Sequence, residues 1–224
     1  SKKQLFDGIA HELRTPLVRL RYRLAMSDNL TDGEQQALNR DIGQLESLID
    51  ELLTYARLDR PQGALKIEPI DLPGWLQDKV ADIQLIHPER DIELNIPHVG
   101  DFGGVDLRLM ERVLDNLVNN GLRYSERRLR VGLWFDGDAA CLQVEDDGPG
   151  IPPEERERVF EPFVRLDPSR DRATGGCGLG LAIVHSIAVA YQGQVFVEAS
   201  SLGGASFRFC WPIKPPLDTK TEPA

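Results

Sequence analysis

The 224-residue sequence predicts an α+β protein, with a helical hairpin at residues 1–60 followed by a two-layer α/β sandwich at residues 66–214. Two observations lead to this prediction. Along residues 1–60, apolar side chains recur at spacings of three and four, as on one face of an α-helix. After a segment with Pro and Gly at residues 61–65, short strand-like runs alternate with longer helical runs, which is typical of helices that cover a sheet. Residues 215–224 are expected to form a flexible tail.

The composition is that of a globular protein and excludes several classes. Hydrophobic residues make up 41% of the chain and charged residues 28%, so a packed core can form. The formal net charge of −10 makes the chain a poor candidate for non-specific binding to nucleic acid, because that requires a basic surface. The three cysteines (Cys141, Cys177 and Cys210) contain no Cys-x-x-Cys pair, which indicates a reducing compartment and argues against a disulfide framework and a structural zinc site. No apolar stretch reaches the roughly 18 to 20 residues of a membrane span, and no signal peptide is recognisable, so we expect a soluble chain.

Residues 1–60 predict two antiparallel helices, each with one apolar face. The first face consists of Leu5, Ile9, Leu13, Leu17, Leu20 and Leu24, and the second of Leu38, Ile42, Leu45, Ile49, Leu52 and Ala56. The second set has the alternating four- and three-residue spacing of a coiled-coil seam. Because two helices cannot bury both faces against each other, we expect two hairpins to form a four-helix bundle. The chain is therefore predicted to be a homodimer through residues 1–60.

The remaining residues predict the elements of the sandwich. Strands are expected at residues 65–67, 92–96, 129–135, 140–144, 194–198 and 206–211, and helices at residues 72–86, 107–124 and 179–192. Asp136-Gly137, between two of the strands, is typical of a tight β-hairpin turn.

His11 is the first candidate for chemistry. It lies about 200° around the first helix from Leu13, and therefore on the solvent side of the apolar face. Pro16 removes the helical hydrogen bond to the Glu12 carbonyl and is expected to bend the helix there. Glu12 can hold one imidazole nitrogen and accept its proton, which leaves the other nitrogen as a nucleophile. An exposed histidine without a role is the alternative.

A polar helix face at Asn116, Asn120 and Arg123 is the second candidate. These residues lie at positions i, i+4 and i+7, on one side of a helix. Amide oxygens can ligate Mg²⁺, and the arginine supplies charge for a phosphate. The alternative is an ordinary polar face. Gly121 in the same helix indicates close packing at that point.

Two glycine-containing segments complete the set. Asp146 ends a predicted strand and is followed by Gly148 and Gly150. Its carboxylate can therefore accept a hydrogen bond from the exocyclic amine of adenine. The alternative is an acidic turn. Residues 174–184 open an apolar helix with glycines, whose backbone N–H groups can bind phosphate. No strand directly precedes this cluster and no Lys-Ser/Thr follows it, so it is neither a Rossmann fingerprint nor a Walker loop. The polar run at residues 165–174 is expected to form a mobile lid.

The motifs His-Glu-x-x-Thr-Pro, Asn-x-x-x-Asn, Asp-x-Gly-x-Gly, Phe-x-x-Phe and Gly-x-Gly-x-Gly occur in this order along the chain. In that order they resemble the motifs of the sensor histidine kinases of two-component signalling, over residues 4–212. The resemblance implies a dimerisation and phosphoacceptor hairpin at residues 1–60, a hinge at residues 61–65 and an ATP-binding catalytic domain at residues 66–214.

The resemblance also implies roles for individual residues. His11 would be phosphorylated, Glu12 would act as its general base, and Thr15 would orient water for dephosphorylation of a partner. Asn120, with Asn116 beside it, would bind Mg²⁺. The other residues that would contact ATP are Arg123, Tyr124, Asp146, Gly148, Gly150, Ile151, Phe163, Arg165, Gly176, Gly178, Leu179, Gly180 and Leu181. Gly121 departs from the family, which usually has Ala there, and this puts the stability of the helix in question.

The activity implied by the resemblance is Mg-ATP-dependent autophosphorylation of His11, followed by transfer to an aspartate of a response-regulator receiver domain and phosphatase activity toward that regulator. The chain would be the cytoplasmic part of a receptor in the bacterial inner membrane. One alternative is an ATPase of the chaperone, mismatch-repair and topoisomerase type, but those proteins carry a water-activating glutamate where this chain has Asn116. The other alternative is a non-catalytic dimeric scaffold that senses ATP.

Overall fold

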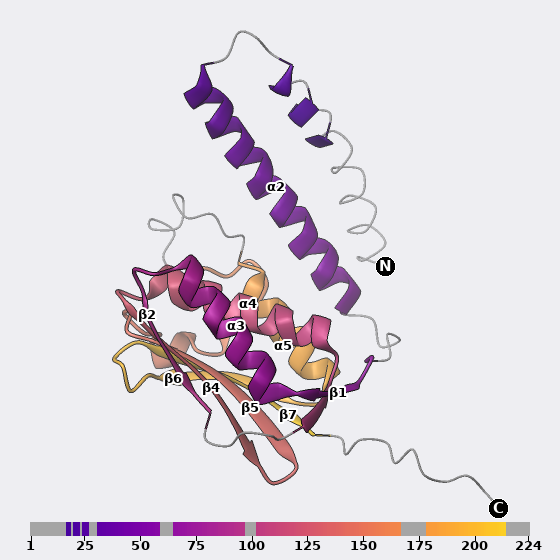
Figure 1. The fold of residues 1–224 in the computed structure, drawn as a ribbon, viewed down its shortest axis with the longest axis vertical. Coiled ribbons are helices and arrows are strands. Elements are labelled where there is room, and N and C mark those ends of the chain that lie inside the picture. Colours follow the sequence, from indigo (N-terminus) through magenta and orange to yellow (C-terminus); the bar gives the residue numbers. More distant parts are fainter. Residues whose placement is uncertain are drawn as a thin grey trace, which may run out of the picture.

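The computed structural model describes residues 17–18, 20–22, 24–26, 31–58, 65–96, 102–166 and 178–213. The long helix α2 (Asp32–Leu58) extends from a layered domain in which helices lie on one face of a sheet (Figure 1). This arrangement confirms the α+β fold that the sequence predicts.

Side chains cap two of the helices at their N-termini. Before α2, the N–H of Thr31 donates to the Glu34 carboxylate at 3.0 Å, and the N–H of Glu34 donates to the Thr31 hydroxyl at 3.4 Å. Before α3 (Leu72–Ile86), the Asp71 carboxylate accepts the N–H of Gly74 at 3.1 Å, and Pro73 stands in the first turn. These local signals define where both helices begin.

The hairpin buries only part of its apolar seam. The buried side chains are Leu17, Leu24, Ile42, Ile49 and Leu53, which form one cluster. Leu53 is buried although the predicted seam contains Leu52 in its place, and Leu52 packs on the layered domain instead. Leu38 and Leu45 belong to the predicted seam but are exposed by 38% and 47%, and Leu20 of the first helix is exposed by 50%. One hairpin alone therefore leaves apolar surface uncovered.

The layered domain contains a five-stranded sheet of order β2-β4-β5-β7-β6 and a two-stranded sheet of β1 and β3. The strands are β1 (Glu68–Asp71), β2 (Asp91–Asn95), β3 (Phe102–Val105), β4 (Arg128–Asp136), β5 (Ala139–Asp146), β6 (Gln194–Ala199) and β7 (Ala205–Pro212). Helices α3, α4 (Leu107–Tyr124) and α5 (Gly180–Ala190) cover one face of the larger sheet (Figure 1), and the short 3-10 helices η1 (Pro153–Glu155) and η2 (Arg158–Phe160) precede α5. Strands β2 and β4 are parallel, and the other neighbours are antiparallel.

The register of β5 and β7 brings two distant segments together. Alternate residues of both strands are buried under the helices; these are Ala140, Leu142 and Val144 on β5 and Phe207, Phe209 and Trp211 on β7. Glu145 pairs with Ser206, so Asp146 at the end of β5 lies beside the start of β7. The N–H of Gly204 donates to the carbonyl of Asp146 at 3.1 Å.

The structure agrees with the predicted helices of this domain and with five of the predicted strands, whose bounds differ by at most two residues. The strand expected at residues 65–67 is wrong, because β1 begins at Glu68. Strand β3 is not predicted, since its two glycines leave no alternating pattern. The turn between β4 and β5 consists of Gly137 and Asp138, one residue later than expected.

Two of the cysteines correct an expectation drawn from composition. Cys141 and Cys210 lie directly opposite each other on β5 and β7, with Cα atoms 4.1 Å apart, and form a disulfide. The expectation of no disulfide is wrong because the pairing depends on sheet register, which a separation of 69 residues does not reveal. Among the described residues, no group of three His, Cys, Asp or Glu side chains could hold a metal ion.

The C-terminal part of α2 contacts the layered domain. Leu52 and Tyr55 pack against the core of that domain, and a cavity of about 520 Å³ lies between Tyr55, η2, α5 and β6. None of the predicted ATP-binding residues lines this cavity. Across the part of the chain that the structure describes, every helix is too short or too polar to cross a membrane.

Candidate functional site

Asp146 ends β5 with its carboxylate buried. Its exposed fraction is 2%, and Oδ1 accepts hydrogen bonds from the N–H groups of Gly148 at 2.9 Å and Ala205 at 3.1 Å. Within the described residues, no donor meets Oδ2. Burial raises the pKa of Asp146, against the opposite effect of the two N–H groups. A carboxylate oxygen that meets no donor in the described part of the chain, on an otherwise buried side chain, is suited to a donor on a ligand.

Asp147, the next residue, has the opposite environment. Its carboxylate accepts the N–H groups of Glu126 at 2.9 Å and Arg127 at 3.1 Å, and it lies 3.6 Å from Nε of Arg128. Burial acts to raise the pKa of Asp147, but the backbone N–H donors outweigh it and hold this pKa below its ordinary value. Asp147 therefore fixes the turn after α4, whereas the donors that meet the Asp146 carboxylate among the described residues both go to Oδ1 and leave Oδ2 without one.

Two glycines allow the backbone to pass close to Asp146. A Cβ at Gly148 would collide with the carbonyl oxygen of Tyr124, and a Cβ at Gly204 would collide with Oδ1 of Asp146. Gly148 belongs to the predicted motif, whereas sequence reasoning does not single out Gly204 or Ala205. A pair of glycines immediately before a strand is the signal that marks this position.

Helix α4 carries the predicted polar face. Asn116, Asn120 and Tyr124 are half-buried, and Arg123 is exposed. Nδ2 of Asn116 donates to the carbonyl of Arg112 at 2.7 Å, and a Cβ at Gly180 would lie 2.7 Å from Oδ1 of Asn116. The amide oxygen therefore faces the N-terminus of α5. Such oxygens suit Mg²⁺, which is commonly shared between a few protein oxygens and substrate phosphates.

The C-terminus of α4 is held by Arg90. Its guanidinium donates to the carbonyls of Leu122 at 3.0 Å, Ser125 at 3.2 Å and Glu126 at 3.1 Å. The last carbonyls of a helix have no partner within the helix, and a cation there also interacts favourably with the negative end of the helix dipole. Arg90 thus fixes the end of α4 next to Arg123 and Tyr124.

Gly121 packs directly on the sheet. A Cβ there would lie 2.6 Å from Cδ2 of Leu129 on β4, and 3.5 Å from the side chain of Val144. The close packing that the sequence indicates is confirmed. Gly in place of the usual Ala therefore lets α4 lie against Leu129.

The N-terminus of α5 lies beside the segment that follows η2. The carbonyl of Gly178 accepts the N–H of Phe163 at 2.9 Å, and a Cβ at Gly178 would lie 2.8 Å from the carbonyl oxygen of Val164. Gly178 has φ of 76°, which side-chain-bearing residues rarely adopt. The first N–H groups of α5 have no acceptor within the helix, which is the arrangement that binds phosphate.

The other predicted residues differ in how they can contribute. Leu179 is fully buried in the core, so its backbone alone can meet a ligand, and Ile151 and Leu181 also pack on the core. Gly150 lies in the loop after Asp146, while Phe163 and Arg165 are exposed. The predicted catalytic residues His11, Glu12 and Thr15, and the glycine Gly176, lie outside the described residues.

Comparison with known proteins identifies the family. Residues 1–61 match the His Kinase A (phospho-acceptor) domain, and residues 105–215 match the Histidine kinase-, DNA gyrase B-, and HSP90-like ATPase family. The chain therefore belongs to the sensor histidine kinases, which confirms the resemblance seen in the motifs. Sensor protein RstB of Escherichia coli (strain K12) is 64% identical over 95% of this chain and 49% of RstB. Sensor histidine kinase CpxA of the same strain is 38% identical over 91% of this chain and 45% of CpxA.

The chain thus spans about half the length of these relatives. Solved structures show the same fold. Full-length ShkA in complex with AMPPNP aligns with a TM-score of 0.78 at 29% identity, over 94% of this chain and 46% of ShkA. Histidine kinase AdeS of Acinetobacter baumannii aligns with a TM-score of 0.65 at 26% identity, over 92% of this chain and 98% of AdeS.

Proposed function

We propose that this chain phosphorylates His11 from Mg-ATP and passes the phosphoryl group to an aspartate of a response-regulator receiver domain. The observation that carries the proposal is the buried carboxylate of Asp146, whose Oδ1 is held by two N–H groups while Oδ2 meets no donor among the described residues. The relative ShkA was solved in complex with AMPPNP, which supports an adenine nucleotide as the ligand.

In this proposal the residues around Asp146 bind and orient the nucleotide. Oδ2 of Asp146 accepts a hydrogen bond from the exocyclic amine of adenine, and the N–H groups at the start of α5 bind phosphate oxygens. Asn116 and Asn120 would hold Mg²⁺, which when bound neutralises phosphate charge in phosphoryl transfer. Arg123 adds positive charge beside them.

The phosphoacceptor chemistry falls to the first helix. Glu12 accepts the proton of one imidazole nitrogen of His11 while the other nitrogen attacks the γ-phosphorus and the bond to the ADP oxygen breaks. Phosphoryl transfer depends mainly on aligning the γ-phosphate with the attacking nitrogen of His11. The hinge at residues 61–65 would therefore carry the ATP-binding domain to His11.

Asn116 separates this proposal from a hydrolytic ATPase, because an amide cannot take the proton of an attacking water. Incubation with γ-labelled ATP and Mg²⁺ tests the difference. We expect label to stay on the protein with little release of free phosphate. Phosphate release without labelled protein would support the ATPase, and ATP binding without either product would leave an ATP-sensing scaffold.

We also propose that the chain is a homodimer through residues 1–60. Beside Leu38 and Leu45, Val18 and Tyr22 of the hairpin are exposed by 57% and 68%. A second hairpin would cover these apolar side chains in a four-helix bundle. Light scattering is expected to give the mass of two chains at micromolar concentration, and a single-chain mass would contradict the dimer.

Two further roles complete the proposal. Thr15 would orient water for dephosphorylation of the regulator, so Thr15→Ala should keep autophosphorylation and slow regulator dephosphorylation. Unchanged regulator dephosphorylation by Thr15→Ala would remove Thr15 from the mechanism.

Because the chain spans about half the length of its relatives, we propose that it is the cytoplasmic part of a membrane-anchored receptor.

A further inference from the structure

Two contacts at opposite ends of α5 join it to α4 or to the residue directly before α4. At one point, Gly180 at the start of α5 lies against the amide of Asn116, inside the candidate nucleotide site. At the other point, Tyr191, directly after α5, reaches Asp106, the residue directly before α4. The two helices therefore run antiparallel, and the second contact lies ten residues, or roughly 15 Å, along α4 from the first.

The second contact consists of buried hydrogen bonds. The Tyr191 hydroxyl accepts the N–H of Asp106 at 2.7 Å and donates to the carbonyl of Asp106 at 3.3 Å, and the tyrosine is 4% exposed. Burial raises the pKa of Tyr191 to about 12, so the hydroxyl keeps its proton at neutral pH. Because a buried N–H without an acceptor is unfavourable, these bonds hold the end of α5 on the first turn of α4.

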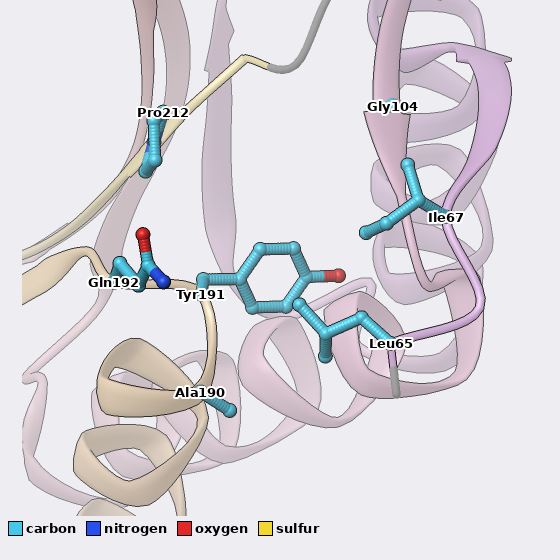
Figure 2. Close-up of a pocket in the computed structure, with 7 residues that line it drawn as sticks. All are labelled: Leu65, Ile67, Gly104, Ala190, Tyr191, Gln192 and Pro212. Carbon is cyan, nitrogen blue, oxygen red and sulfur yellow. The ribbon is translucent and has the colours of Figure 1, made fainter. Parts of the chain in front are cut away.

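Asp106 also binds the segment that enters the domain after α2. Its Oδ2 accepts the N–H of Lys66 at 3.1 Å and a guanidinium N–H of Arg108 at 3.0 Å. Figure 2 shows the Tyr191 ring extending from the end of α5 with its hydroxyl directed toward Leu65 and Ile67. Leu65, Ile67 and Tyr191 line a cavity of about 20 Å³ there, and Leu65 and Ile67 pack against the core that contains Tyr191.

We propose that Tyr191 and Asp106 form a joint that transmits the position of residues 65–67 to α4 and α5, and that Tyr191 is thereby a positioning residue for the nucleotide site. This inference rests on the proposed function, which supplies the ligand. A displacement of residues 65–67 pulls the Lys66 N–H against Asp106, and this changes how α4 is held against α5 at Asn116. Coupling between two sites is reciprocal, so a nucleotide bound at Asn116 and Gly180 orders residues 65–67 in turn.

Hydrogen exchange of the 224-residue chain with and without AMPPNP tests the joint. In the unaltered chain, AMPPNP should slow exchange at residues 146–150 and also at residues 65 and 67, by roughly threefold or more at both places. Tyr191→Phe keeps the ring, which packs on Phe209 at 6.1 Å, and should retain protection at residues 146–150 but lose it at residues 65 and 67. Leu85→Ala shortens a side chain that is 80% exposed on α3, and it should behave as the unaltered chain.

Lys66→Pro provides a second variant, because it removes the N–H donor to Asp106 and leaves Tyr191 in place. It should also lose the protection that AMPPNP gives to residues 65 and 67, which we call remote protection. A merely structural role of Tyr191 would lower the melting temperature without removing the effect of AMPPNP on residues 65 and 67. The joint would be overturned if remote protection persisted in both variants. It would also be overturned if the unaltered chain showed protection at residues 146–150 but none at residues 65 and 67. No protection at residues 146–150 would instead contradict nucleotide binding, and with it both the proposed function and the joint.

Discussion

The N–H of Ala205 donates a hydrogen bond of 3.1 Å to Oδ1 of Asp146, and this bond joins the first residue of β7 to the last residue of β5. Together with the N–H of Gly148, it holds the carboxylate in one orientation. Gly204 allows this approach, because a Cβ at Gly204 would collide with the same oxygen. The proposed adenine site is therefore built from two segments that lie 59 residues apart in the chain.

Gly204→Ala should displace the Asp146 carboxylate and weaken nucleotide binding. We expect the Kd for AMPPNP to rise about tenfold or more, equivalent to roughly 1.4 kcal/mol. Titration calorimetry measures this change. Gly43→Ala is a matched control, because nothing lies within 4 Å of a Cβ on that α2 glycine, and it should leave the Kd unchanged. Equal affinity of Gly204→Ala and the unaltered chain would contradict the role of this close contact.

The pKa of Asp146 predicts a pH dependence of nucleotide binding. Burial raises this pKa above its ordinary value of 3.8, so the carboxylate becomes protonated at higher pH than an exposed aspartate does. Affinity for AMPPNP should fall as the pH is lowered through this raised pKa, since binding requires the ionised form. Asp146→Asn should bind weakly at every pH. Asp147→Asn should keep the pH dependence of binding and lower stability instead; loss of the dependence in this variant would contradict the assignment.

Arg90→Ala should destabilise the ATP-binding domain. The substitution leaves the carbonyls of Leu122, Ser125 and Glu126 without their charged donor. We expect the free energy of unfolding to fall by about 1 to 3 kcal/mol, measured by urea titration. Arg127→Ala, at an exposed position nearby, serves as the control. Equal stability of the two variants would show that Arg90 does not hold the end of α4.

The raised pKa of Tyr191 predicts a loss of stability at alkaline pH. The unfolded chain releases the tyrosine proton near the ordinary pKa of 10, whereas the folded chain holds it up to about 12. The contribution of this group is therefore fully present below pH 10 and is lost as the pH rises from 10 to about 12. The difference in unfolding free energy between the unaltered chain and Tyr191→Phe should be constant from about pH 7 to 9 and shrink above pH 10. A constant difference across the whole range would contradict the shift.

The disulfide predicts the number of reactive thiols. Of the three cysteines, Cys141 and Cys210 are paired, so one thiol should react in the denatured, unreduced chain and three after reduction. Because the bond closes a loop of 69 residues, reduction should lower stability by roughly 4 kcal/mol on the chain-entropy account. Thiol titration and thermal unfolding measure the two effects. Three reactive thiols before reduction would show that the pair stays reduced.

The sequence predicts what depends on local pattern. Helix α4 has its predicted bounds because its apolar residues recur with helical period, and α3 begins where Asp71 and Pro73 provide start signals. The disulfide and the role of Gly204 could not be predicted, since both depend on the register between β5 and β7. Sequence alone also cannot explain why Asp146 and Asp147 differ, because their environments come from β7 and from the turn after α4.

Phosphorylation of His11 tests the central proposal most directly. The unaltered chain and His11→Gln are incubated with γ-labelled ATP and Mg²⁺, and the labelled protein is exposed to acid and to alkali. We predict acid-labile, alkali-stable label on the unaltered chain and none on His11→Gln, while both chains bind AMPPNP with the same Kd. Incorporation of label into His11→Gln at the rate of the unaltered chain would contradict the proposal.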